Sequence, residues 1–415
     1  MSKNVQLRGT TWGHRRAIDP LIEASRAYAQ TYGAAGVRWS IRDLTAFEHQ
    51  PLADAMSDCD LLIFDHPFVG EIAASGLFLP LDDVLFSVTD GAIAESYAGP
   101  SLDSYRWSGK LWGAPVDAAT MHGVLRPDLL ARMERAAPTT WSEVVALGRV
   151  ARKHGLWLGV ANGDHHGFLA IGSMMHNRGH SWTTHSEVGL QFDLAAFAEA
   201  LEQLDEVTAF AHPGCGAFNA IALQDAMSSR DDIVYCPLTF GYATYGEADH
   251  GARRLGFAPA PGMREPYCAG TLLGGAGVGL SASCTDMVAA KAFVAFLLSP
   301  KTQSDIFARH HGQPACASCW VDPVIDDRFN GYFLAVGDTI RQAAIRPRFK
   351  GYGQFEKLAG NAVGAFLRKE RGLEETLSGM SELVERHGAI NGLSEVSSQG
   401  NITGRELSGE LSLQS

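Results

Sequence analysis

Residues 59–65 read CDLLIFD, a short run in which four consecutive apolar side chains stand between two acidic ones. Such a run is typical of a parallel strand that is covered by helices on both faces. Upstream, residues 5–12 and 37–44 predict two further strands. Between them, residues 19–33 predict a helix that begins with an Asp N-cap followed by Pro. This β-α-β-α-β order predicts an open, doubly wound parallel sheet with the strand order 2-1-3.

A second α/β unit follows in the middle of the chain. The capping box TWSE at residues 140–143 opens a helix, the amphipathic pattern of 193–210 predicts a long helix, and 233–238 predict another buried strand. Residues 354–387 are again helical, with a break near Gly372. A chain of 415 residues is long enough for two domains. The predicted fold class is therefore α/β, with two doubly wound units.

Composition narrows the possible functions. The chain has 46% hydrophobic and 19% charged residues and a formal net charge of −12. We expect no nucleic-acid partner, because the sequence has no dense Lys/Arg cluster that could neutralise phosphates. No apolar run approaches the ~20 residues needed to span a bilayer. The first five residues lack the pattern of a secretory signal, which predicts a cytoplasmic protein if this start is the native one.

Metal and cofactor motifs are missing from the sequence. The seven cysteines are odd in number and widely scattered, which is not the pattern of a disulfide framework. Cys316 and Cys319 form a CxxC pair, but no second pair follows at zinc spacing. The histidine pairs at 165–166 and 310–311 have no third ligand at a suitable spacing, and HExxH, GxSxG and P-loop motifs are absent. We therefore expect neither a metal nor a cofactor.

Four segments occur in an order that is typical of one protein family. They are GKLWGAPVD at residues 109–117, PTTWSE at 138–143, GGAGVGL at 274–280, and a helical pattern at 289–298 that is followed by Ser299, Pro300 and Gln303. Together they resemble the family 1 extracellular solute-binding proteins of ABC importers, the maltose-binding-protein type. The resemblance extends over roughly residues 5–387.

This resemblance implies two α/β lobes, each with its own sheet, that close on a small-molecule ligand by hinge motion (periplasmic-binding-protein-like, type II). It also implies a membrane permease as partner, a monomer and a periplasmic location. The chain is expected to cross between the lobes near residues 115–118 and to return near 259–272. The implied parts are 1–115 (first part of lobe 1), 116–260 (first part of lobe 2), 261–312 (return to lobe 1), 313–387 (late helical segment shared between lobes) and 388–415 (flexible tail).

Side chains suited to recognition follow the first and third predicted strands. TTWGHRR ends the first strand and DHP ends the third. In a 2-1-3 sheet these ends are neighbours at the carboxyl edge, where open α/β sheets bind ligands. Trp12 could stack on a ligand while His14, Arg15 or His66 donates hydrogen bonds. Alternatively, Trp12 caps the core and the arginines pair with surface acids.

Four further candidates come from the expected crossings and from the second unit. Asp117 could accept hydrogen bonds from sugar hydroxyls, or only stabilise the hinge. Tyr242 follows a buried strand and could contact the ligand. Gly275 would allow close approach of the backbone, or serve a tight turn. Arg348, like Arg346, could reach the cleft or stay solvated.

The expected ligand is a sugar, a polyol or an organic acid. The family favours a carbohydrate, whereas the Arg and His side chains at the strand ends favour an anion, which would contact Arg15 or His14. The alternative function is an enzyme on the same bilobal scaffold that uses a cleft cysteine as nucleophile. Cys236, expected at the end of a strand, is the candidate, although a buried cysteine is more often a small hydrophobe.

Overall fold

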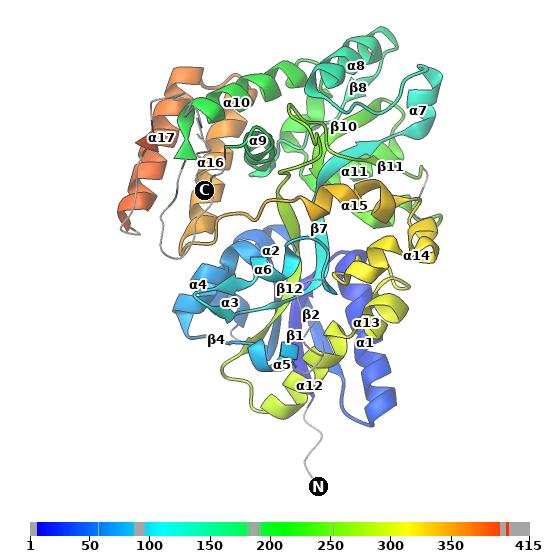
Figure 1. Cartoon of the computed structure of the whole chain (residues 1–415), viewed down its shortest axis with the longest axis vertical. Helices are drawn as coiled ribbons and strands as arrows, with labels where there is room; N and C mark the ends of the chain where they lie inside the picture. Colours follow the sequence, from blue (N-terminus) through cyan, green and yellow to red (C-terminus); the bar gives the residue numbers. More distant parts are fainter. Residues whose placement is uncertain are drawn as a thin grey trace, which may run out of the picture.

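The computed structural model describes residues 6–56, 58–86, 96–180, 182, 190, 192–251, 253–390 and 396–397. Helices and strands form two lobes that are stacked along the long axis of the molecule (Figure 1). The lower lobe in this view, lobe 1, contains the N-terminal strands. The upper lobe, lobe 2, contains the middle of the chain and the last two long helices. The predicted α/β fold class with two lobes is confirmed.

Lobe 1 is built from the first part of the chain and is completed by helices that follow lobe 2 in sequence. Its elements are β1 (Leu7–Trp12), α1 (Arg15–Tyr32), β2 (Val37–Arg42), α2 (Leu44–His49), α3 (Leu52–Met56), β3 (Leu61–Phe64), α4 (Val69–Ser75), β4 (Phe78–Leu79), α5 (Asp82–Phe86), α6 (Ser101–Ser104), β5 (Arg106–Trp107), β6 (Lys110–Leu111), α12 (Met287–Leu298) and α13 (Pro300–Thr302).

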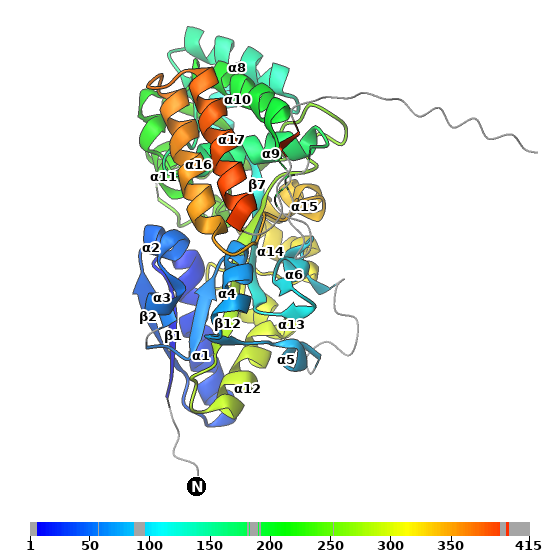
Figure 2. The same cartoon turned by 90° about the vertical axis from the view of Figure 1, so that its left-hand side faces the viewer.

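Lobe 2 contains most of the longer helices, and two of them, α16 and α17, lie side by side along it (Figure 2). Its elements are α7 (Pro127–Arg132), α8 (Trp141–Lys153), β8 (Trp157–Leu158), α9 (His166–Asn177), β9 (Phe192–Asp193), α10 (Leu194–Thr208), α11 (Ala220–Ser229), β10 (Ile233–Phe240), β11 (Gly256–Ala258), α16 (Tyr352–Leu367), α17 (Leu373–Ile390) and β13 (Val396–Ser397). Two long strands connect the lobes, and two helices follow them near the interface: β7 (Ala114–Leu125), β12 (Leu273–Ser281), α14 (Pro323–Arg328) and α15 (Tyr332–Arg341).

The strand order in lobe 1 confirms the prediction from sequence. β1 lies between β2 and β3 and is parallel to both, so the order is 2-1-3. The apolar run quoted above forms β3, whose four residues are all buried. β12 then pairs antiparallel with β3. The carboxyl ends of β1 and β3 therefore meet at one edge of the sheet, and this edge faces lobe 2.

The expectation that each lobe has a separate sheet is wrong. β12 pairs with β3 through residues 277–280 and with β7 through residues 273–278. β7 continues beyond this region and pairs with β10 and β11 of lobe 2 through residues 121–125. The hydrogen-bonded path therefore runs without a break through β2-β1-β3-β12-β7-β10-β8. Two long strands, and not loops, carry the backbone between the lobes.

Helix α1 begins five residues earlier than the sequence predicts. The Asp-Pro pair at residues 19–20 suggests a start there, but the helix begins at Arg15 and contains Pro20. The imidazole of His14 acts as N-cap and accepts a hydrogen bond from the backbone N–H of Arg16. The early start places Arg16 in the first helical turn, where its side chain is buried.

The other element predictions agree more closely with the structure. The capping box at 140–143 is present at the start of α8, the strand at 233–238 is part of β10, and the break near Gly372 separates α16 from α17. The predicted tail 388–415 lies outside the described residues, except for the end of α17 and for β13.

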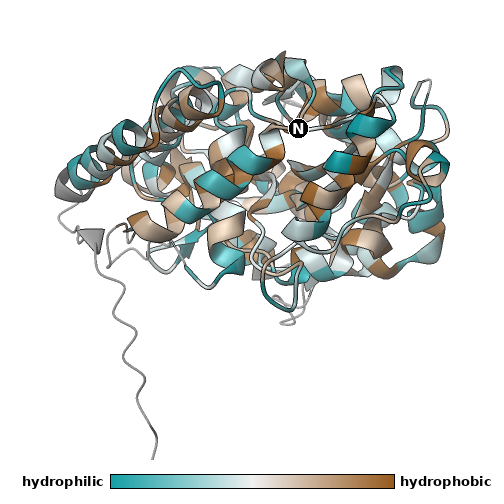
Figure 3. Cartoon of the chain, turned by 90° about the horizontal axis from the view of Figure 1, so that it is seen from above, coloured by the Kyte–Doolittle hydropathy of each residue, from teal (hydrophilic) through white to brown (hydrophobic). Residues whose placement is uncertain are grey.

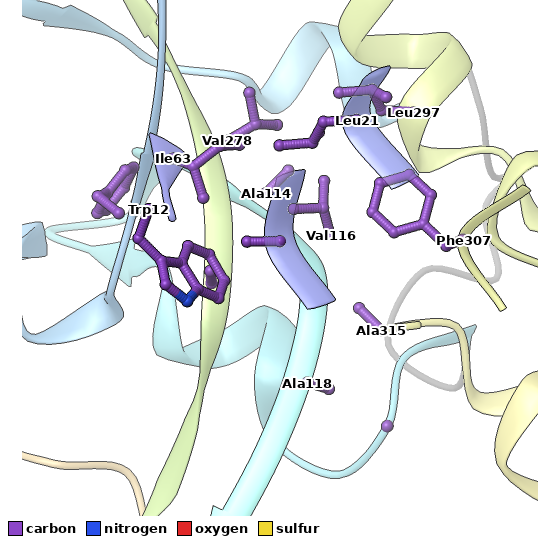
Figure 4. Close-up of a cluster of buried hydrophobic side chains, with 14 of the residues drawn as sticks. Trp12, Leu21, Ile63, Ala114, Val116, Ala118, Val278, Leu297, Phe307 and Ala315 are labelled. Atoms are coloured by element: carbon purple, nitrogen blue, oxygen red, sulfur yellow. The ribbon is translucent and has the colours of Figure 1, made fainter. Parts of the chain in front are cut away.

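The core of lobe 1 lies between its sheet and the helices on both faces. Ile63, Val116 and Val278 from three neighbouring strands pack together with Leu21 of α1 and Leu297 of α12 (Figure 4). Seen from above, the surface helices carry both hydrophilic and hydrophobic residues along their lengths (Figure 3). None of the helices in the described ranges is both long enough and apolar enough to cross a membrane.

Candidate functional site

A cavity of about 50 Å³ lies between the lobes, next to the carboxyl ends of β1 and β3. Both lobes and both connecting strands line it, so a molecule inside it would contact all of them. Lobe 1 contributes Trp12, Arg16, Leu44, Phe47, Glu48 and Asp65; β7 and β12 contribute Asp117, Ala119, Gly274 and Gly275; and the remaining walls come from His165, His166, Ala220, Phe240, Tyr242 and Arg346.

A buried ion pair between Arg16 of α1 and Asp117 of β7 forms one wall. Arg16 Nε donates to Asp117 Oδ2 at 2.8 Å, and Nη2 donates to the other carboxylate oxygen. Its Nη1 donates to the carbonyl of Gly241 in lobe 2 at 3.1 Å. Burial alone would lower the pKa of Arg16, but the Asp117 carboxylate raises it, so the guanidinium stays charged. The pair thus connects lobe 1, a crossing strand and lobe 2.

A second buried arginine of the cavity, Arg346, forms a separate group of ion pairs. Its guanidinium pairs with Asp65 at the end of β3 and lies 3.5 Å from Glu356 of α16. Burial would raise the pKa of Asp65, but the charge of Arg346 and a hydrogen bond from His66 lower it to about 2. Arg346 Nε is buried and has no hydrogen-bond partner among the described residues. This N–H is therefore a donor that a bound molecule could use.

Aromatic rings and one further carboxyl group complete the cavity. The indole of Trp12 packs on Phe47 with ring centroids 4.7 Å apart, and its Nε1 has no hydrogen-bond partner within the described part of the chain. The guanidinium of Arg16 lies 4.6 Å from the ring centroid of Tyr242. Burial, together with the nearby carboxylates, raises the pKa of Glu48 well above its usual value. A protonated Glu48 would both donate and accept hydrogen bonds.

Gly275 brings the two crossing strands close together beside the cavity. It has φ +109°, in a region that favours glycine, and lies opposite Ala118 of β7. A Cβ at this position would be 2.4 Å from the carbonyl oxygen of Asp117. The sequence GGAGVG therefore belongs to strand β12, and Gly275 allows the β12 backbone to approach Asp117, the residue that pairs with Arg16.

Four of the eight predicted contact residues line the cavity: Trp12, Asp117, Tyr242 and Gly275. The other four do not line it in this conformation. His14 caps α1 and lies against Tyr242 with a ring centroid distance of 4.7 Å. Burial, followed by the charge of Arg16, lowers the pKa of His14 to about 3, so the imidazole is neutral at pH 7.

The remaining three predicted residues stabilise the walls from behind or lie outside them. Arg15 interacts with Asp249 at 3.3 Å and with His311 at 2.8 Å. His66 is buried, and its Nδ1 lies 3.1 Å from Asp65. Arg348 Nη1 donates to three backbone carbonyls of lobe 1, those of Asp103, Ser104 and Arg106.

The sequence predictions omit several residues that line the cavity. Arg16 directly follows the predicted residues His14 and Arg15, and a helix start at His14 would have identified it, because the first turn then faces lobe 2. Arg346 and Arg348 lie two residues apart, and the sequence offers no signal that separates an arginine that lines the cavity from one that binds backbone carbonyls. Phe47 and Glu48 lie on α2, a short helix that the sequence analysis did not predict.

Cys236 does not line the cavity. It lies inside β10, and not at the end of a strand as expected, and is fully buried. Burial raises the pKa of its thiol, which opposes formation of a nucleophilic thiolate. Within the described ranges, no group of three or more His, Cys, Asp or Glu side chains could hold a metal ion.

Comparisons with known proteins agree with this architecture. Several similar solved structures, among them the following three, have TM-scores near 0.76. Maltose-bound MalE3 of T. maritima has 17% identity and a TM-score of 0.76, covering 92% of this chain and 99% of that one. An ABC transporter solute-binding protein from Agrobacterium radiobacter K84 in complex with ribitol has 19% identity and a TM-score of 0.77, and the match covers 93% of this chain and 98% of that one. UgpB from Mycobacterium tuberculosis in complex with glycerophosphocholine has 15% identity and a TM-score of 0.76, and the match covers 94% of this chain and 100% of that one.

These likenesses establish the fold. No curated protein sequence matches the chain. The sequence profile of the bacterial extracellular solute-binding proteins, however, matches residues 44–319, which is more than half of the chain. The matched region includes Glu48, Asp65, Asp117 and Tyr242 of the cavity. The chain therefore belongs to the bacterial extracellular solute-binding protein family.

Proposed function

We propose that the protein captures a small, neutral, polyhydroxylated solute, a polyol or a monosaccharide, in the cavity between its lobes. The observation that carries this proposal is the pairing of both arginines that line the cavity. Arg16 is held by Asp117, and Arg346 is held by Asp65 and Glu356. An anionic ligand would have to compete with these carboxylates for the guanidinium groups, whereas a neutral one would not.

The hydrogen-bonding groups of the cavity suit hydroxyls. A hydroxyl both donates and accepts, so it can donate to the carboxylates of Asp65 and Asp117 and accept from the N–H groups of Trp12 and Arg346. The rings of Phe47, Phe240 and Tyr242 would contact the apolar C–H faces of a sugar or polyol, and the indole of Trp12 would do the same. A few convergent polar groups among aromatic walls are typical of small-molecule sites. Structural relatives in complexes with maltose, ribitol and tagatose support this class.

The size of the cavity favours a compact ligand. About 50 Å³ corresponds to room for about three to five water molecules. This volume suits a short polyol or one sugar ring better than an oligosaccharide. Because both lobes enclose the cavity, we propose that the ligand enters when the lobes separate by bending of β7 and β12.

The sequence also suggested an organic acid that contacts Arg15 or His14. The geometry gives this alternative less support, because Arg15 is engaged with Asp249 and His311 away from the cavity. The low pKa of His14 leaves it without positive charge at pH 7. We propose no enzymatic function, since neither the family nor the surroundings of Cys236 support one.

The family to which the chain belongs suggests the remaining parts of the function. We propose that the protein acts outside the cytoplasm, as a monomer, and delivers its solute to the membrane permease of an ABC importer. Three of the similar solved structures are described as ABC transporter solute-binding proteins or ABC substrate-binding proteins, which supports this assignment.

A thermal-shift series tests the ligand class. The probes are ribitol, glucose, maltose, malate and glycerophosphocholine, each from micromolar to millimolar concentration. A ligand that binds only the folded protein at 100 times its Kd stabilises it by about 2.7 kcal/mol, which raises Tm. We expect ribitol or glucose to raise Tm and malate to leave it unchanged. A shift with malate alone would refute the proposal of a neutral ligand.

A further inference from the structure

The CxxC pair at Cys316 and Cys319 has no role in the proposed solute site, yet its geometry is specific. Cys316 is the N-cap of the short 3-10 turn Ala317–Val321 and Cys319 lies within that turn, where its N–H donates to the carbonyl of Cys316 at 3.1 Å. Residues three apart in a 3-10 turn lie directly above one another. The hydrogen bond between Cys319 and Cys316 is that of a tight turn, in which the first and fourth Cα atoms lie within about 7 Å, the range that a disulfide can bridge.

The chemistry of this pair differs from that of the other five cysteines, all of which lie in described ranges. A hydrogen bond from the Cys319 thiol, assisted by Ser318, lowers the pKa of Cys316 to about 6. The same hydrogen bond and burial raise the pKa of Cys319. In each of the other five, burial raises the pKa of the thiol. Cys316 is thus the thiol best able to react at neutral pH.

The pair lies at the end of a segment that supports the cavity. The carbonyl of Gln313 accepts a hydrogen bond from Ala118 at 3.1 Å, and its side chain donates back to the Ala118 carbonyl at 2.8 Å. The backbone of Pro314 forms an isolated antiparallel β-bridge with that of Asp117, and the backbone of Cys316 forms one with that of Tyr97 in lobe 1. Gln313 and Pro314 therefore lie beside β7 next to the backbone of Asp117, and Cys316 lies two residues further on.

We propose that Cys316 and Cys319 form a reversible intramolecular disulfide, and that this bond stiffens residues 313–320 behind Asp117. Both thiols are free in the present structure, which represents the reduced form. Each is nearly buried, with 6% and 1% of its surface exposed, but Ser318 between them is exposed, so the turn lies at the surface. Zinc is a poor alternative, because no further ligand group accompanies the pair in the described part of the molecule.

The reaction is a thiol–disulfide exchange with an external disulfide such as glutathione disulfide or an oxidised oxidoreductase. The Cys316 thiolate attacks one sulfur of that disulfide and releases one thiolate, which leaves a mixed disulfide on Cys316. Cys319 then loses its proton and attacks the Cys316 sulfur, releasing the second thiolate. Two protein thiols are oxidised to one disulfide while the external disulfide is reduced to two thiols, so two electrons are transferred.

The first test uses the wild-type protein, so it does not depend on the folding of a variant. The protein is equilibrated with glutathione disulfide, denatured, alkylated with iodoacetamide and mapped by mass spectrometry. We expect five alkylated cysteines and a peptide with an internal Cys316–Cys319 bond. Seven alkylated cysteines at equilibrium, or a bond between other residues, would overturn the proposal. As a matched control, the Cys236→Ser variant should form the bond and the Cys319→Ser variant should not.

The second test examines the stiffening. Amide hydrogen exchange of the oxidised and the reduced protein is compared peptide by peptide. We expect slower exchange in residues 313–320 of the oxidised form and the same exchange in the peptides of α8 and α10, far from the turn. Equal exchange rates at 313–320 in the two forms would refute the effect on this segment. Neither measurement requires a ligand, so both are independent of the proposed solute.

Discussion

The buried pair of Arg16 and Asp117 can be tested with a substitution that removes charge but little volume. In Asp117→Asn, Arg16 keeps its hydrogen bond to Gly241 but loses its counter-charge. The side chain of Arg16 is only 4% exposed, so water cannot replace the carboxylate. Removing one partner of a buried pair costs about 3–5 kcal/mol. For a chain of 415 residues the entropy of unfolding is about 0.9 kcal/mol/K, so Tm should fall by about 3–6 °C.

The assay is thermal unfolding by circular dichroism without ligand, followed by calorimetric titration with the polyol or sugar that binds the wild type. Asp249→Asn is the matched control, because Asp249 also pairs with an arginine of α1 but is exposed and lies outside the cavity. Exposed pairs contribute about 0–1 kcal/mol, so this variant should melt within about 1 °C of the wild type. It should also bind with unchanged affinity.

A double substitution separates the structural role of the pair from its role in binding. Replacing Arg16 with Met and Asp117 with Leu removes both charges and leaves apolar side chains of similar size. We expect Tm to recover to near the wild-type value, since hydrophobic replacement of a buried pair is often neutral or stabilising. Ligand affinity should stay at least 10-fold weaker than in the wild type. If Asp117→Asn melts and binds like Asp249→Asn, the assignment of Asp117 to the site is wrong.

Three further predictions concern the walls of the cavity and its response to pH. Trp12→Phe keeps an aromatic wall but removes the Nε1 donor, so affinity should fall by about 10-fold, on the ~1.5 kcal/mol scale of a hydrogen bond, with little change in Tm; unchanged affinity would exclude this donor. Gly275→Ala would place a Cβ 2.4 Å from the Asp117 carbonyl oxygen at φ +109°, so we expect lower expression or a lower Tm. The control Gly251→Ala has φ +82° but no atom within 4 Å of the new Cβ, so its Tm should fall less. Equal Tm values for the two variants would contradict this. Burial lowers the pKa of the fully buried His66 and His122 to about 4. Between pH 4 and 6.5 both imidazoles therefore stay neutral in the folded state, whereas those of the unfolded chain take up protons. The free energy of unfolding should be full above about pH 6.5 and fall towards pH 4, by up to about 1.4 kcal/mol per pH unit for each histidine. Unfolding in urea across this pH range measures the slope, and a flat profile would refute the contribution of His66 and His122.

Local sequence signals were sufficient for the fold of each lobe. The apolar run of β3, the capping box of α8 and the Gly76 C-cap of α4 each depend on interactions between residues that are close in sequence. The continuous sheet was not predictable in this way. It depends on the pairing of β7 with β12, two strands separated by the whole first part of lobe 2, and their pairing register is not encoded in either strand alone.

The site was predicted in part for the same reason. Trp12 and Asp117 could be placed because strand ends and lobe crossings have known positions in this class of fold. The role of Arg16 depended on whether α1 starts at His14 or at Asp19, and histidine is an uncommon N-cap. The arrangement that decides the ligand class, two arginines each neutralised by a carboxylate from a distant part of the sequence, exists only in three dimensions.

The position of β12 has a consequence for how the chain folds as it is made. Among the described residues, β12 is the strand that pairs with the edge of β3 away from β1, and the ribosome adds it after residues 127–262 of lobe 2. Until then a nascent chain would present an unpaired, apolar strand edge, the kind of surface that invites aggregation or chaperone binding. The first lobe to be translated therefore cannot reach its native form until the first part of lobe 2 has been made.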